Sequence, residues 1–216
     1  MELSNIKFER KIIGFNLYWI SILAVGTFLL LRSMGGNLIN WNTLGFEVLF
    51  PLYTAIMTGE CVKIRSDPMF EVFEAQSRSL FRWVFVCYLY TFVVTGILVV
   101  IGMTVNQAMD SAFTFGKFLC IYLTTAFFLS TLAVLCSIFT SSSHVAVAVC
   151  GIYWLFSMLV RSLLKISFVP YVYLFICFAD ESSPVWLLNK CILTIMGMLM
   201  WLIVWLLCKK RIAIMQ

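Results

Sequence analysis

The sequence predicts an all-α membrane protein with six transmembrane helices, and three observations lead to this fold class. The 216 residues are 62% hydrophobic and only 12% charged, and their mean hydropathy is +1.01, which is far more apolar than a soluble domain requires. The apolar residues form runs long enough to cross the hydrocarbon core of a bilayer. Basic residues are concentrated near the ends of these runs. We therefore expect residues 1–216 to form a single transmembrane domain in a lipid bilayer.

Residues 1–11 predict an amphipathic helix on the cytoplasmic surface of the membrane. Lys7, Arg10 and Lys11 lie among apolar residues in this stretch, which is the pattern of a helix that lies in the interface plane. A frayed terminus is the alternative, because the stretch is short.

Six apolar runs are expected to cross the membrane in succession. They comprise residues 14–31, 43–62, 83–105, 116–139, 145–160 and 191–208. The second run contains two carboxylates, Glu47 and Glu60. A carboxylate in hydrocarbon is costly, so we expect Glu47 to face a path or a subunit interface, with extension toward the outer headgroups as the alternative. Glu60, at the other end of the run, is expected to reach the cytosolic interface.

Residues 167–179 are apolar and aromatic but are not expected to form a seventh span. The stretch is too short for a helix that crosses a bilayer, and it is typical of a re-entrant or interfacial segment. Six spans with both termini in the cytoplasm place ten of the fifteen basic residues inside, whereas a seventh span would move the last three of these outside. The ten are Lys7, Arg10, Lys11, Lys63, Arg65, Arg78, Arg82, Lys209, Lys210 and Arg211.

The longest polar interruption, residues 60–82, lies between the second and third spans and predicts a short cytoplasmic helix. Asp67 is a good N-cap, and Pro68 suits the first helical position. Glu71 lies near the positive end of the helix dipole, and Glu74 can pair with Arg78 one turn later. Phe70 and Phe73 contribute to an apolar stripe that suits docking on a membrane surface or a partner protein. A solvated loop is the alternative.

Motifs for chemistry within the chain are missing from the sequence. There is no Gly-x-x-x-x-Gly-Lys-Ser/Thr loop for ATP. His144 is the only histidine, and the eight cysteines contain no Cys-x-x-Cys pair. We therefore expect no catalytic, metal-binding or cofactor-binding residues, and the modest net charge of +5 reflects membrane topology rather than binding to nucleic acid.

Together these features resemble the membrane subunit of type-2 ABC exporters, and the resemblance covers nearly the whole chain. That family has an N-terminal amphipathic helix, six spans and a loop after span two with two acidic residues and a Ser-Arg pair. Here the loop reads Gly59-Glu60, then Glu71, then Ser77-Arg78. The family also has a broken, membrane-dipping segment between spans five and six, and residues 167–187 look like it.

The resemblance implies a permease subunit in the cell membrane that is not itself an enzyme. Two such subunits, identical or paired with a homologous permease, would enclose a path for a peptide, drug-like or lipidic substrate. Two copies of an ATPase subunit would bind ATP and Mg²⁺ and would receive the helix formed by residues 67–82. Two other classes remain open: a six-span substrate-binding module of the vitamin-uptake kind, and an integral membrane enzyme such as a lipid transferase.

Overall fold

The protein is a bundle of long helices, and no strand occurs in the part of the chain that the structure describes. The computed structural model describes residues 16–34, 41–62, 80–109, 114–140, 143–166, 168–180 and 183–215. The amphipathic helix predicted for residues 1–11 lies outside these ranges. So does most of the cytoplasmic helix predicted for residues 67–82, including Asp67, Phe70, Glu71, Phe73, Glu74 and Arg78. Both helices stay predictions.

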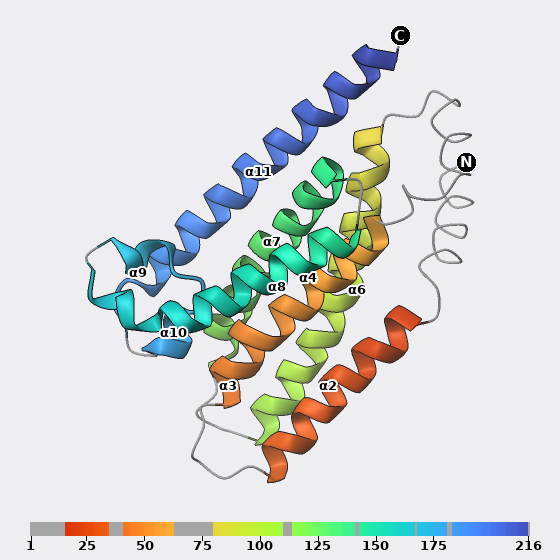
Figure 1. The fold of residues 1–216 in the computed structure, drawn as a ribbon. Coiled ribbons are helices and arrows are strands. Elements are labelled where there is room, and N and C mark those ends of the chain that lie inside the picture. Colours follow the sequence, from red (N-terminus) through yellow and green to blue (C-terminus); the bar gives the residue numbers. More distant parts are fainter. Residues whose placement is uncertain are drawn as a thin grey trace.

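Six long helical stretches follow one another in alternating directions (Figure 1). The first is α2 (Asn16–Met34), and the second is continuous through α3 (Trp41–Thr43), the π-helix η1 (Leu44–Leu49) and α4 (Phe50–Val62). Then come α6 (Leu80–Met109), α7 (Phe115–Thr140), α8 (Ser143–Leu159) and finally α11 (Trp186–Met215). In consequence α2 begins, α4 ends, α6 begins and α11 ends toward the same end of the bundle.

Four helices are long and apolar enough to cross a membrane: Leu80–Ala108, Phe115–Thr140, His144–Leu164 and Trp186–Lys209. They correspond to the spans predicted at residues 83–105, 116–139, 145–160 and 191–208. The spans predicted at residues 14–31 and 43–62 correspond to α2, which contains a shorter apolar helix (Tyr18–Ser33), and to the helix over residues 41–62. That these two also cross the membrane stays a prediction.

The π-helix η1 has a cause in the sequence. Pro51, the second residue of α4, has no N–H, and its ring collides with the carbonyl four residues earlier in a regular helix, here that of Glu47. The turn widens instead, and the N–H of Phe50 donates to the carbonyl of Gly45 five residues earlier. Turns of this kind are common at functional sites, and this one determines where Glu47 points.

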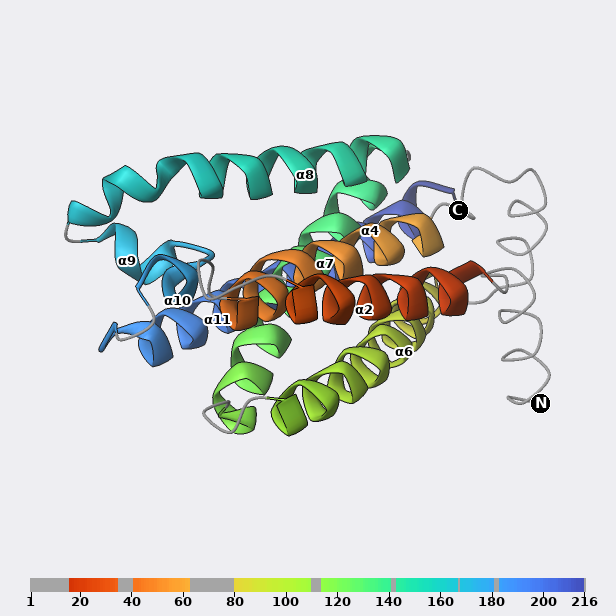
Figure 2. The ribbon, with the colours of Figure 1, turned by 90° about the horizontal axis from the view of Figure 1, so that it is seen from below.

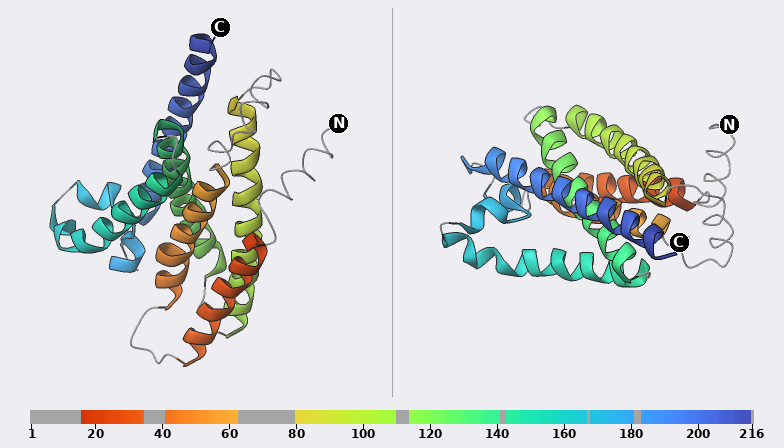
Figure 3. Two further views of the ribbon diagram at one scale, coloured as in Figure 1. Left: turned by 45° about the vertical axis from the view of Figure 1, so that its right-hand side comes forward. Right: turned by 90° about the horizontal axis from the view of Figure 1, so that it is seen from above.

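Helix α7 is the centre of the bundle. In its most apolar stretch 61% is buried, against 11% for α8 and 22% for α11. Views along and around the bundle show α6 and α8 on opposite flanks (Figures 2 and 3). One buried cluster includes Phe46, Tyr122 and Phe175, and a second includes Val84, Val134 and Val204. These clusters hold α4, α6 and α11 around α7.

The chain between α8 and α11 is broken into short elements rather than one long helix, and that it re-enters the membrane or lies at its surface stays a prediction. It comprises the 3₁₀-helix η3 (Val160–Lys165), α9 (Val169–Val172) and α10 (Ile176–Ala179). In Figure 1 these elements lie beside the start of α11, far from the end at which α4 ends and α6 begins. Helix α11 begins at Trp186, five residues before the predicted start of the last span at residue 191, so Asn189 and Lys190 belong to its first turns.

Candidate functional site

A buried ion pair joins α11 to η1 at this broken end of the bundle. The Nζ atom of Lys190 lies 2.6 Å from Oε1 of Glu47, and the two side chains are 1% and 0% exposed. Charges of this kind are costly to bury unless they are paired and hydrogen-bonded. The surroundings of both side chains meet that condition.

Glu47 accepts hydrogen bonds from the backbone at α10. The N–H of Phe178 donates to Oε2 at 2.6 Å, and the N–H of Cys177 donates to Oε1 at 3.3 Å. These residues belong to the first turn of α10, where the N–H groups have no partner within the helix. Glu47 therefore supplies from η1 the acceptors that a four-residue helix cannot supply for itself.

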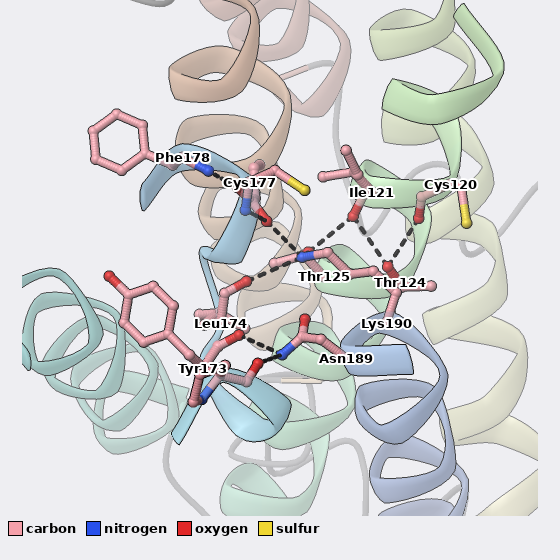
Figure 4. Close-up of polar contacts among 12 residues, drawn as sticks. Cys120, Ile121, Thr124, Thr125, Tyr173, Leu174, Cys177, Phe178, Asn189 and Lys190 are labelled. Carbon is pink, nitrogen blue, oxygen red and sulfur yellow. Dashed lines mark hydrogen bonds and ion pairs between the residues drawn. The ribbon is translucent and has the colours of Figure 1, made fainter. Parts of the chain in front are cut away.

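The ammonium group of Lys190 donates three hydrogen bonds. Besides Glu47, it donates to Oγ1 of Thr125 on α7 at 3.0 Å and to the carbonyl of Leu174 at 3.1 Å (Figure 4). An ammonium group has three hydrogens, so every donor of Lys190 is engaged. The contact with Thr125 ties the pair to the central helix of the bundle.

Asn189 holds the neighbouring part of the same segment. Its side-chain N–H group donates to the carbonyls of Pro170 and Tyr173 at 2.9 and 2.8 Å (Figure 4). A broken segment in an apolar environment leaves carbonyls that no helix satisfies, and each is costly if left alone. Asn189 and Lys190 together satisfy three of these carbonyls from the first turns of α11.

Helix α8 contacts both the π-helix η1 and the broken segment through Trp154. The indole N–H of Trp154 donates to the carbonyl of Val48 at 2.9 Å, and the Trp154 ring meets the Phe175 ring edge to face, with centroids 6.2 Å apart. We call Glu47, Thr125, Trp154, Asn189 and Lys190 the polar clamp. It joins η1, α7, α8 and α11 around residues 169–179.

Among the predicted site residues that the structure describes, the polar clamp contains Glu47 and not Glu60. Glu47 has no exposed surface and is satisfied within the chain, so its carboxylate does not extend to headgroups, and a role for it in transport stays a prediction. Glu60 is exposed near the opposite end of α4, and its role at a path or interface also stays a prediction. No group of three or more metal-ligating side chains occurs among the described residues.

Sequence reasoning missed Lys190 and Asn189. The last span was predicted to begin at residue 191, which left Lys190 just outside it. The usable signal was a pair of isolated opposite charges, Glu47 and Lys190, each at the edge of an apolar run and each expensive without a partner.

Comparisons with known proteins do not identify a family, since no family model, curated protein or solved structure matches this chain.

Proposed function

We propose that the chain is the permease subunit of an ATP-driven exporter of the type-2 ABC class, in which two permeases enclose a path and two ATPase subunits bind ATP and Mg²⁺. The observation that carries the proposal is the placement of two segments at opposite ends of one helix. Residues 63–79 follow α4 directly. At the far end of the same helix, Glu47 holds the broken segment between α8 and α11.

This arrangement supports six crossings with both termini on the cytoplasmic side of the cell membrane. Residues 63–79 then lie in the cytoplasm, where an ATPase can reach them, and residues 169–179 lie at the outer end. The substrate would be a peptide, a drug-like molecule or a lipidic molecule, as the resemblance to this class of exporter implies.

The orientation can be tested with introduced cysteines, because the native Cys61, Cys177 and Cys208 are buried. Ser162 and Lys209 are both exposed, at opposite ends of the bundle. In a background with the exposed Cys120 and Cys191 changed to serine, a membrane-impermeant maleimide should label Ser162→Cys on intact cells. Lys209→Cys should react only after permeabilisation. Labelling of Lys209→Cys from outside would contradict the proposed orientation.

The partnership can be tested by copurification. We expect the tagged chain to bring down an ATPase together with a second permease, and the double variant Phe70→Ala/Phe73→Ala to lose the ATPase while staying in the membrane. Buried aromatic anchors typically contribute ~2 kcal/mol or more each to such interfaces.

A matched control is Phe85→Ala. It removes a ring that packs on Trp201 within the bundle, with ring centroids 5.4 Å apart, and it should leave the ATPase bound. An ATPase that stays bound to the Phe70/Phe73 variant would exclude the predicted helix as the docking element. Recovery of a transmembrane coupling protein with the ATPase would favour the uptake class, and recovery of no ATPase would favour a membrane enzyme.

A further inference from the structure

We propose that the polar clamp makes the helix over residues 41–62 and the broken segment over residues 169–179 move as one body. A displacement at the end of the bundle where α4 ends would then displace the broken segment at the opposite end. The coupling is a property of this chain alone. Its use in transport rests on the proposed function.

The first step is the continuity of the helix. α3, η1 and α4 follow one another without a gap from residue 41 to residue 62, a length of about 30 Å at the rise of a helix. Its last turn leads into residues 63–79, and its first turns carry Glu47. A displacement of one end therefore displaces the other.

The second step is the kind of contact that Glu47 makes. It binds two backbone N–H groups of α10, at Cys177 and Phe178, rather than side chains that could change rotamer. If η1 moves, the segment must therefore move with it or lose these charge-assisted hydrogen bonds, which are stronger than neutral ones.

The third step is that the other end of the segment is held by different elements. Asn189 and Lys190 bind the carbonyls of Pro170, Tyr173 and Leu174 from α11. The segment thus spans the junction between η1 and α11, and the Glu47–Lys190 pair closes this junction directly. Movement of α4 relative to α11 must therefore either carry the segment along or open the pair.

A reversible crosslink at the other end of α4 tests the coupling without any partner protein. Thr91 of α6 donates its hydroxyl to Sγ of Cys61 at 2.9 Å, so Thr91→Cys places two thiols together where α4 ends. Oxidation fixes α4 to α6 at that point, and reduction releases it. The readout is hydrogen exchange at the amides of residues 173–178 in the full-length chain, with Cys120 and Cys191 changed to serine.

We expect oxidation to slow exchange at residues 173–178 by about tenfold, which is within the usual range of coupling between distant sites. The same crosslink in a Glu47→Met/Lys190→Met background, which removes both acceptors for the N–H groups of Cys177 and Phe178 and leaves no unpaired charge, should change this exchange by less than about twofold. As a matched control, Ser157→Ala removes a buried hydroxyl of α8 that donates to the carbonyl of Tyr153 in the same helix, and it should keep the full response.

Two results would overturn the coupling: exchange at residues 173–178 that is the same before and after oxidation, and a response of equal size in the Glu47→Met/Lys190→Met background. Neither depends on an ATPase. If the crosslink response appears but no ATPase copurifies, the coupling stands and the proposed function fails. If an ATPase copurifies but oxidation has no effect, the proposed function stands and the coupling fails.

Discussion

Replacement of Lys190 by methionine is expected to lower the free energy of unfolding by roughly 3–5 kcal/mol, because it leaves the Glu47 carboxylate buried without its partner charge. Methionine fills a similar volume, so the loss does not come from a cavity. The hydroxyl of Thr125 and the carbonyl of Leu174 also lose the donor that they have in the wild-type protein. The measurement is the melting temperature of the purified protein in detergent, together with the yield of folded protein.

Lys209→Met provides the matched control on the same helix. Lys209 is exposed and lies 5.4 Å from the centre of the Trp205 ring, an arrangement that contributes about 0.5–1 kcal/mol at an exposed site. The melting temperature should therefore fall much less. Equal, small effects of the two substitutions would mean that the buried pair contributes little to stability.

The helical framework could be predicted from the sequence because each span is a local property. Apolar runs separated by polar residues place α6, α7 and α8 within a few residues of their observed bounds. Residues 167–179 were not expected to form a crossing helix for a similar reason, since the run is too short to span a bilayer. The predicted features in residues 1–11 and 67–79 lie outside the described residues.

The polar clamp could not be predicted because it depends on which helices are neighbours. Glu47 and Lys190 are 143 positions apart, and nothing local to either residue identifies the other. Lys190 can reach Glu47 because α11 begins at Trp186, before the predicted start of the last span at residue 191. The orientation of Glu47 further depends on the π-helix, which a helical period of 3.6 residues does not anticipate.

The hydrogen bonds of the polar clamp also select which position carries the acid and which carries the base, because the described partners of Glu47 are donors and those of Lys190 are acceptors. The exchanged pair, Glu47→Lys with Lys190→Glu, is therefore expected to remain about as unstable as Lys190→Met. The Coulomb attraction is retained, yet a lysine at position 47 faces the N–H groups of Cys177 and Phe178, and a glutamate at position 190 faces the carbonyl of Leu174. Each unsatisfied buried group costs on the order of 1–3 kcal/mol.

The neutral pair, Glu47→Gln with Lys190→Gln, removes both charges but keeps an acceptor at position 47 and a donor at position 190. A glutamine at position 47 can offer its oxygen to the N–H of Phe178, and a glutamine at position 190 can donate to the carbonyl of Leu174. No charge is then left unpaired, so this variant should melt above both Lys190→Met and the exchanged pair, although below the wild-type protein. The three melting temperatures, measured in one detergent, give the order directly. If the exchanged pair melts like the wild-type protein, attraction between the charges is sufficient, and the backbone groups of residues 174–178 do not select which charge each helix carries.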